Sequence, residues 1–184
     1  MATFRRSITP GATYFFTVVT YRRRAVLTDP PCYRALREAF RRTKLNHPFD
    51  VEALVLLPDH LHCIWTLPPS DADYAMRWSL IKRFTSQSLR QALDPRVSAS
   101  RRARGELGLW QRRFWEHQIR DDRDLVRHTD YIHWNPVKHG YVKQAKDWPH
   151  STFHRLVRQG IYDVDWGGGS GEKESLMASR LDIL

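Results

Sequence analysis

LVLLPDHLHCIWTL, residues 54–67, holds two apolar segments joined at Pro58-Asp59, and this pattern predicts a β-hairpin. His60 and His62 open the second segment. Side chains alternate between the two faces of a strand, so both imidazoles are expected to project from one face. They could therefore bind one metal ion or, in the alternative interpretation, only cap the turn. The hairpin by itself identifies neither the metal nor a reaction.

Segments on both sides of the hairpin show strand or helix patterns. Residues 12–21, ATYFFTVVTY, are aromatic and β-branched, which predicts a central strand. The patterns also predict strands over 49–57 and 114–120, helices over 32–46, 73–93 and 124–140, and a short helix within 148–160. The order β-α-β-β-α-β-α predicts an α+β fold, in which helices pack on an antiparallel sheet of ferredoxin-like type. Helices on one face would leave the other face for substrate.

The last long helix has clear boundary signals. Asp121 offers an acidic N-cap, and Gly140 predicts the end of the helix. Tyr131 and Asn135 lie four residues apart, hence on one face of a regular helix. Pro136 opposes that geometry, because it biases Asn135 away from the α region and can end or kink the helix.

The charge is unevenly distributed along the 184 residues, whose formal net charge is +10. Residues 160–184 hold five acidic and two basic residues, a charge of −3, so +13 belongs to residues 1–159. We expect one domain over residues 1–159, followed by an acidic, glycine-rich tail over residues 160–184. A basic body favours a polyanionic partner, either nucleic acid or an anionic membrane surface.

Cysteine content and hydropathy exclude several classes of protein. Cys32 and Cys63 form no CxxC pair, which argues against a disulfide framework or a zinc finger. No apolar run approaches the roughly 20 residues of a transmembrane helix, and the N-terminal residues contain no signal-peptide core. We therefore expect a cytoplasmic protein that does not bind membranes.

Arginines and tryptophans are the candidates for contact with nucleic acid. Residues 94–113 hold six arginines among turn residues, which predicts a mobile basic loop. Single-stranded nucleic acid is bound by cationic grooves with aromatic stacking surfaces, although arginine runs are often only solvated faces. The stacking candidates are Trp110, Trp115, Trp134 and Trp148. The groove candidates are Arg22, Arg23, Arg24, Lys82, Arg83, Arg101, Arg102, Arg104, Arg112 and Arg113.

Four segments, taken together, resemble a known family. In order, they are LPDHLHCIWTLP (57–68), FWEHQIRDD (114–122), HTDYIHWNPVKHGYV (128–142) and DWPHSTFHR (147–155). They resemble the REP-associated tyrosine transposases, relatives of the single-strand insertion-sequence transposases of the HUH endonuclease class. The resemblance extends over roughly residues 1 to 166, and residues 94–108 match none of its motifs.

The resemblance implies a fold of HUH endonuclease type and a role for each motif residue. His60 and His62 would be the metal-binding pair, Tyr131 the single catalytic tyrosine, and Asn135 a further metal ligand. The implied reaction is attack of Tyr131 on a DNA phosphate, which gives a covalent 5′-phosphotyrosine and a free 3′-hydroxyl. The implied cofactor is Mg²⁺ or Mn²⁺. Imidazole and amide ligands suit Mn²⁺ at least as well as Mg²⁺, so the identity of the metal stays open.

We therefore expect a metal-dependent single-strand DNA endonuclease and strand transferase. The resemblance implies that it acts on palindromic repeats folded into hairpins, and that it is nucleoid-associated in a bacterial cytoplasm, as a monomer or a homodimer. The main alternative is a catalytically idle hairpin-binding protein on the same scaffold, in which Tyr131 is a core side chain and Asn135 only shapes a turn. An RNA phosphoesterase of the two-histidine-motif type is disfavoured, because the sequence has one His-x-His element and no internal duplication.

Overall fold

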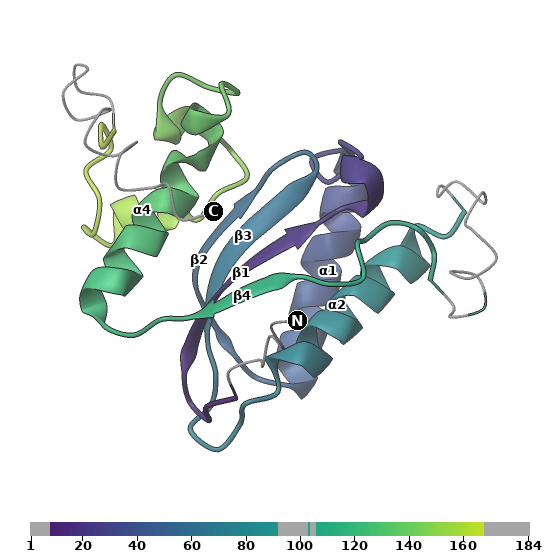
Figure 1. Cartoon of the computed structure of the whole chain (residues 1–184). Helices are drawn as coiled ribbons and strands as arrows, with labels where there is room; N and C mark the ends of the chain where they lie inside the picture. Colours follow the sequence, from purple (N-terminus) through teal and green to yellow (C-terminus); the bar gives the residue numbers. More distant parts are fainter. Residues whose placement is uncertain (1–7, 92–102, 104–105, 168–184) are drawn as a thin grey trace, which may run out of the picture.

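The computed structural model describes residues 8–91, 103 and 106–167, and its centre is a four-stranded antiparallel sheet (Figure 1). The strand order is β2-β3-β1-β4. The strands are β1 (Thr13–Val19), β2 (Asp50–Leu56), β3 (His60–Thr66) and β4 (Trp115–Gln118). The β2-β3 hairpin therefore lies beside β1, and the short β4 closes the other edge of the sheet.

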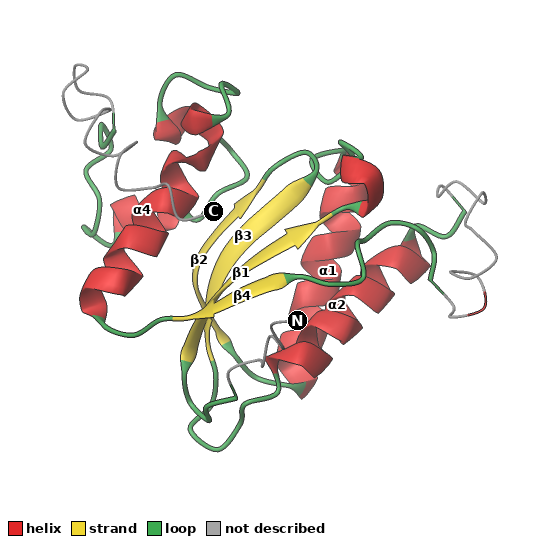
Figure 2. Cartoon of the chain, in the orientation of Figure 1, coloured by secondary structure: helices red, strands yellow, loops and turns green. Residues whose placement is uncertain are grey.

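Helices cover both faces of this sheet, as Figure 2 shows. They are α1 (Pro30–Asn46), α2 (Tyr74–Ser88), α4 (Asp122–Lys138) and α5 (Phe153–Arg158), with 3-10 turns η1 (Tyr21–Arg23) and η2 (Ala145–Asp147). The helices α1 and α2 pack side by side on one face, whereas α4 contacts β2 and β3 on the other. The expectation that one face of the sheet is free is wrong, because α4 occupies part of it.

The alternation of side chains along β3 separates two apolar cores. Leu61, Cys63 and Trp65 face α1 and α2 and are fully buried. Ile64 faces α4, together with Phe15 of β1. His60 and His62 lie four and two residues before Ile64 on β3. Alternate residues of a strand share a face, so both histidines project toward α4. The structure therefore places both histidines on one face of the sheet, as predicted.

The predicted fold class is confirmed, and the element boundaries differ by a few residues. The helix predicted over 73–93 ends at Ser88. Its predicted apolar stripe, from Tyr74 through Trp78 and Ile81 to Leu89, is buried. The predicted cap Asp121 accepts a hydrogen bond from the backbone N–H of Asp124 at 2.8 Å, as expected of an N-cap carboxylate.

The segment predicted as a mobile basic loop is only partly described. Of residues 94–113, the structure describes Ala103 and residues 106–113. Leu109 and Trp110 are buried, and the backbone of Trp110 pairs with Thr20 at the end of β1. For this end of the segment the prediction of a mobile loop is wrong, because apolar burial fixes it to the sheet.

Residues 160–167 contact the body of the molecule. The Tyr162 hydroxyl donates a hydrogen bond to Asp130 of α4, and the Trp166 ring lies 4.8 Å from the Tyr162 ring. The rest of the acidic tail lies outside the described residues, so the domain boundary at residue 159 stays a prediction. Within the part of the chain that the structure describes, none of the helices has the length and apolar character needed to cross a membrane.

Candidate active site

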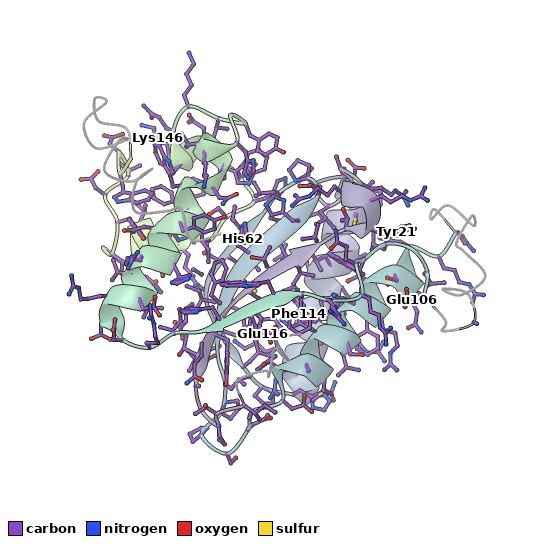
Figure 3. All side chains as sticks on the ribbon, viewed as in Figure 1. Tyr21, His62, Glu106, Phe114, Glu116 and Lys146 are labelled. Atoms are coloured by element: carbon purple, nitrogen blue, oxygen red, sulfur yellow. The ribbon has the colours of Figure 1, made fainter. Side chains whose placement is uncertain are left out.

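The start of β3 and the middle of α4 bring the predicted histidine pair and tyrosine together. The His60 and His62 rings are 4.9 Å apart, and the His62 and Tyr131 rings are 5.1 Å apart. Figure 3 marks His62 on the face of the sheet next to α4. Phe15 of β1 packs against both His62 and Tyr131, at 5.5 and 6.0 Å between ring centres. Residues that are 69 positions apart in the sequence, His62 and Tyr131, thus form one cluster.

His62 is oriented by the neighbouring strand. The β1-β3 register places Thr17 opposite His62, and the Thr17 Oγ1 lies 2.9 Å from the His62 Nδ1. The other ring nitrogen, Nε2, is buried and has no hydrogen-bond partner among the described residues. Burial, followed by the nearby positive charges of His60 and His139, holds the pKa of His62 well below its ordinary value. The neutral ring therefore keeps a lone pair.

His60 is oriented by the preceding residue. The His60 Nδ1 lies 2.6 Å from the Asp59 Oδ1, and Arg23 donates a hydrogen bond to the other Asp59 oxygen at 3.1 Å. Burial lowers the pKa of His60, although Asp59 partly opposes that effect. Burial alone would raise the pKa of Asp59, but hydrogen bonds from His60 and Arg23 bring it below its ordinary value. Asp59 therefore fixes both the ring and a cation beside it.

Tyr131 and Asn135 lie one helical turn apart on the side of α4 that faces the sheet. Tyr131 is 8% exposed and Asn135 is fully buried. Burial raises the pKa of the Tyr131 hydroxyl, and the nearby Asn135 side chain partly opposes that rise. Neither polar atom of the Asn135 side chain has a hydrogen-bond partner among the described residues. A buried amide without partners is rare, so Asn135 is a candidate ligand residue beside Tyr131.

Pro136 does not break the helix. The helix α4 continues from Asp122 to Lys138, with Pro136 inside its last turn. The predicted alignment of Tyr131 and Asn135 on one face is therefore present in the structure. His139 donates its backbone N–H to the Asn135 carbonyl at 3.0 Å, so helical hydrogen bonding continues after the proline.

Two further side chains at this site, Lys138 and His139, were not predicted from the sequence as part of it. The Lys138 Nζ lies 5.4 Å from the centre of the Tyr131 ring. The His139 ring lies 5.4 Å from the His60 ring. Lys138 follows Tyr131 by seven residues, about two helical turns, so helical spacing could have placed it on the same face as Tyr131. His139 lies outside the regular helix, where no periodicity applies.

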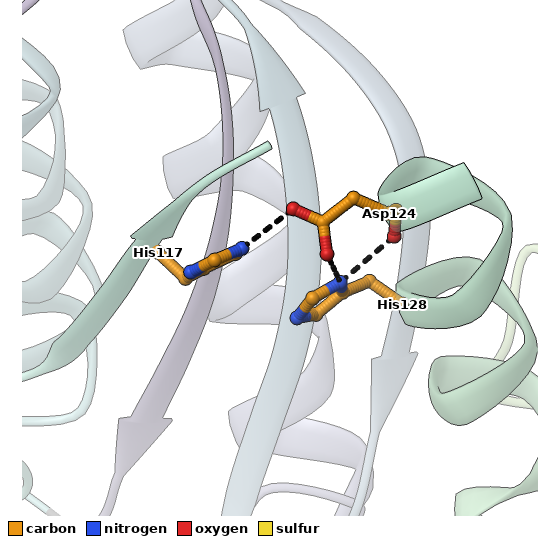
Figure 4. Close-up of side chains that lie close together, drawn as sticks. All are labelled: His117, Asp124 and His128. Carbon is orange, nitrogen blue, oxygen red and sulfur yellow. Dashed lines mark hydrogen bonds and ion pairs between the residues drawn. The ribbon is translucent and has the colours of Figure 1, made fainter. Parts of the chain in front are cut away.

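A second cluster of titratable groups joins the start of α4 to β4, as Figure 4 shows. His117, Asp124 and His128 place their ligand atoms within 4.8 Å of one another. The His117 Nε2 lies 2.8 Å from the Asp124 Oδ2, and the His128 Nδ1 lies 3.3 Å from the Asp124 Oδ1. Among the described residues, this is the group of three His, Cys, Asp or Glu side chains whose geometry could hold a metal ion.

The hydrogen bonds of the second cluster use most of its candidate ligand atoms, whereas the His128 Nε2 is buried and has no hydrogen-bond partner among the described residues. The His128 Nδ1 donates to the Asp124 carbonyl at 2.8 Å, because a carbonyl oxygen can only accept. The Arg120 Nε donates to the Asp124 Oδ2 at 3.0 Å. Burial would raise the pKa of Asp124, but Arg120 and His117 lower it far below its ordinary value. A metal ion at this cluster would have to replace these interactions.

The predicted DNA-contacting cations are not all in one place. Arg22, Arg23 and Arg24 follow β1 at the end of the sheet that carries His60. Lys82, Arg83 and Arg112 instead line a hollow of about 670 Å³ between α2 and residues 106–114. Of the remaining four candidates, Arg113 is exposed, and Arg101, Arg102 and Arg104 lie outside the described residues.

Two of the four stacking candidates are core residues. Trp110 and Trp134 are 7% and 6% exposed, so neither can stack on a base in this structure, and the prediction is wrong for them. Their indole rings fill the two apolar cores instead. Trp115 and Trp148 are half-buried and keep an accessible edge.

Comparison with known proteins agrees with this geometry. Residues 9–135 match the family of IS200-like transposases. A REP-associated tyrosine transposase of Escherichia coli (strain K12) is 46% identical over 169 residues, which cover 91% of this chain and 92% of that protein. A Haemophilus influenzae protein that carries the same family name is 46% identical over 170 residues, which cover 91% of this chain and 94% of that protein.

A solved structure of the REP-associated tyrosine transposase bound to a REP hairpin is similar throughout. It is 45% identical, with a TM-score of 0.76, and the match covers 92% of this chain and 93% of that one. Sequence, fold and motif order agree over nearly the whole chain. The protein therefore belongs to the IS200-like transposase family and, within that family, to the REP-associated tyrosine transposases.

Proposed function

We propose that this transposase is a metal-dependent endonuclease and strand transferase that cleaves single-stranded DNA through a covalent 5′-phosphotyrosine at Tyr131. One observation carries the proposal. The Tyr131 ring lies 5.1 Å from the ring of His62, whose buried Nε2 has no partner among the described residues. A nucleophile and an unused metal-ligand atom therefore share one site, as phosphoryl transfer by an activated hydroxyl requires.

The residues of this site fit a divalent metal ion. His60 and His62 each have the Nδ1 occupied by a neighbour, Asp59 and Thr17, which directs each Nε2 into the site. The buried Asn135 supplies an amide oxygen that has no partner among the described residues. A bound Mg²⁺ or Mn²⁺ would polarise a nonbridging oxygen of the scissile phosphate. These three side chains are the proposed ligands.

The side chains around Tyr131 account for the rest of the reaction. The Tyr131 oxygen forms a bond to phosphorus while the bond to the 3′-oxygen breaks, so one phosphodiester replaces another. The phenol loses one proton and the leaving oxygen gains one. Lys138 lies beside the Tyr131 ring, where its charge favours the phenolate and offsets the phosphate charge. Because the exchange conserves a diester, the 3′-hydroxyl can reverse it or a second strand can complete transfer.

The proposed substrate is a palindromic repeat folded into a hairpin. The similar solved structure is bound to a REP hairpin, and 45% identity over 92% of the chain supports the same class of DNA here. The exposed Arg22 and Arg23 lie beside the histidine end of the sheet, where they can neutralise DNA phosphates. Both the monomer and the homodimer remain compatible with this proposal.

The test is to trap the covalent adduct. Incubation with Mn²⁺ and a hairpin oligonucleotide should give a protein-DNA adduct that survives denaturing electrophoresis. Tyr131→Phe should abolish the adduct, and Tyr162→Phe, which alters a hydroxyl on the far side of α4, should leave it in place. An adduct that persists in Tyr131→Phe would refute the assignment of the nucleophile.

The alternative function, a catalytically idle hairpin-binding protein, has one observation in its favour. Tyr131 is 8% exposed and its pKa is raised, neither of which is expected of an activated hydroxyl. A hairpin that binds tightly but is not cut with Mg²⁺, Mn²⁺ or Zn²⁺ would support this alternative.

A further inference from the structure

A continuous series of aromatic rings leads away from the candidate active site. The His139 ring lies 5.4 Å from His60 and 5.9 Å from Tyr141. The Tyr141 ring lies 5.4 Å from Trp148, at an interplanar angle of 27°. The His150 ring lies 5.9 Å from Trp148 and 4.9 Å from Tyr33. We call this series the aromatic track, and it comprises His139, Tyr141, Trp148, His150 and Tyr33.

Tyr141 is the exposed member of the track. It is 45% exposed, and the other large apolar side chains that are exposed in the described residues are all aliphatic. The catalytic chemistry proposed above does not use Tyr141, nor do the two apolar cores include it. The exposed Tyr141 ring, packed on one side against Trp148, is a surface on which an unpaired base can stack.

Backbone hydrogen bonds hold the track in place. The helix α4 ends at Lys138 and is followed by Gly140, whose φ is +71°, and the backbone N–H of Tyr141 donates to the Pro136 carbonyl at 2.9 Å. This is the Schellman arrangement, which fixes the residue after the glycine. The Trp148 indole N–H donates to the Leu56 carbonyl of β2 at 3.0 Å. The rings are therefore positioned before any ligand binds, which lowers the entropic cost of stacking on them.

The surroundings of the track favour an anionic chain that carries flat rings. Lys138 precedes the track. Arg23 donates a hydrogen bond at 3.1 Å to Asp59, the partner of His60. Proteins that hold single-stranded nucleic acid combine cationic groups for the backbone with aromatic rings on which unpaired bases stack. The track begins at His139, 5.4 Å from His60, so the nucleotides next to a phosphate at Tyr131 are within reach of it.

We propose that the aromatic track, with Tyr141 as its main contact, stacks the unpaired bases that flank the scissile phosphate. The inference rests on the proposed function, because it takes Tyr131 and the histidine pair as the cleavage site. It adds a binding surface that is separate from the chemistry. It also states which part of the DNA substrate that surface binds: the single-stranded extension and not the paired stem.

The first test compares two oligonucleotides in a Tyr131→Phe background, which removes the proposed nucleophile. One is a hairpin with a single-stranded extension across the cleavage site, and the other is the same hairpin with a blunt end. Tyr141→Ala should weaken binding of the extended hairpin about tenfold, as expected from the loss of one stacked base. Binding of the blunt hairpin should not change. Tyr141→Phe should restore binding, and Leu45→Ala, an exposed apolar residue on α1, should have no effect.

The second test locates the stacked base. Abasic sites are placed one at a time along the extension, and the affinity of each oligonucleotide is measured for proteins with and without the Tyr141→Ala substitution. When the abasic site replaces the base that stacks on Tyr141, Tyr141→Ala should cause no further loss of affinity. When the abasic site is at any other position, Tyr141→Ala should still cause its full loss of affinity. The inference would be overturned if Tyr141→Ala weakened binding of the blunt and the extended hairpin equally. It would also be overturned if Tyr141→Ala caused its full loss of affinity at every abasic position. If the Tyr131→Phe protein binds neither oligonucleotide, the proposed function fails with it.

Discussion

At the scale of single residues, the orientation of the imidazoles decides what the candidate site can bind. The ring of His62 has one nitrogen beside Thr17 and the other buried without a partner among the described residues. For the buried Nε2 to bind a metal, the Nδ1 must carry the proton and donate it to the Thr17 hydroxyl. Thr17 therefore sets the tautomer of the proposed ligand without touching the metal.

Replacing Thr17 by the isosteric valine tests this role. Thr17→Val removes the hydroxyl that accepts from His62, and we expect Mn²⁺ to bind about tenfold more weakly. The measurement is a titration with Mn²⁺ followed by electron paramagnetic resonance. Thr13→Val is the matched control, because Thr13 lies on the same strand and bonds to Thr66 instead.

The same titration distinguishes the two clusters. His62→Ala should abolish Mn²⁺ binding, and His117→Ala should leave it unchanged, because Asp124 already holds His117 and Arg120. If His117→Ala abolishes binding and His62→Ala does not, the metal site is the cluster at the start of α4.

The sequence revealed the residues of the site whose spacing is local. Strand alternation placed His60 and His62 on one face, and helical spacing placed Tyr131 and Asn135 on one face, whereas the roles of these residues were implied by the resemblance to the transposase family. Thr17 could not be predicted as the partner of His62, because that contact depends on the register between β1 and β3. The cluster of His117 with Asp124 was missed for a similar reason, since it joins a strand to a helix across a turn.

At the scale of the elements, α4 is the part whose position decides the geometry of the site. Its apolar residues pack in the core on this face of the sheet, and the bond of Asp124 to His117 joins its first turn to β4, next to the bond of Asp124 to Arg120. This polar cluster complements the packing of Phe15 against Tyr131, which fixes the middle of the helix. The loss of either contact should change the distance between the histidine pair and Tyr131.

We predict that Asp124→Asn destabilises the protein by about 2 kcal/mol at pH 7, the scale of hydrogen bonds to a charged group. The folded pKa of Asp124 lies below its ordinary value of 3.8. Its contribution is therefore present above pH 3.8 and is lost as the pH falls through the folded pKa. Thermal unfolding measured across the acid range should show that acidification lowers the stability of Asp124→Asn less than that of the unsubstituted protein.

Asp122→Asn is the control for this prediction. Asp122 lies in the same first turn of α4, is exposed, and shares the favourable position near the helix N-terminus. It should change stability by only a few tenths of a kcal/mol. Equal effects of the two substitutions would show that the helix dipole, and not the cluster, accounts for the role of Asp124.

The C-terminal end of α4 gives a prediction with an internal control. Gly140→Ala and Gly160→Ala both place a side chain at a φ of +71°, and in both cases the new Cβ meets no atom within 4 Å. Each should cost about 1 kcal/mol in chemical denaturation, because only backbone strain is added. Only Gly140→Ala should also weaken binding of the extended hairpin, since Tyr141 follows it. Weaker binding in both variants would argue against the track.

The element types were predictable, whereas the sheet order was not. Alternation and helical spacing identified the strands and long helices, and Gly140 and Asp121 marked the ends of α4. No local pattern indicates that β1 lies between β3 and β4, or that α4 packs on the face opposite α1 and α2. Arg77 illustrates the same limit: it reads as a solvent-facing cation but is fully buried, with bonds to Asp71 and to the carbonyls of His47 and Pro48.

At the scale of the whole molecule, charge determines how strongly DNA is bound and how salt weakens it. Residues 1–159 carry a charge of +13, and the cations among the described residues lie on both sides of the sheet, for example Lys82 on α2 and Lys138 on α4, so only some of them can contact one substrate. The arginines of η1 lie at the histidine end of β3, whereas Lys82 and Arg83 lie along α2. A DNA strand at Tyr131 should contact the first group.

We predict that Arg22→Ala reduces the slope of log affinity against log salt concentration by about one, as expected for the loss of one phosphate contact. Arg37→Ala is the control, because Arg37 is equally exposed but lies on α1, on the face of the sheet opposite α4. Affinities measured for one hairpin at several salt concentrations give the slope. An unchanged slope in Arg22→Ala would exclude η1 from the binding surface.

The distance in sequence between β3 and α4 has a consequence for the cell that makes this protein. A chain is synthesised from its N-terminus at about 5–20 residues per second. The hairpin with the histidine pair is complete at Thr66, but Tyr131 is translated 65 residues later. If Tyr131 is the nucleophile, a nascent or prematurely terminated chain that ends before α4 carries the histidine pair and yet cannot cut DNA. Synthesis of α4 is then the event that makes the protein a nuclease.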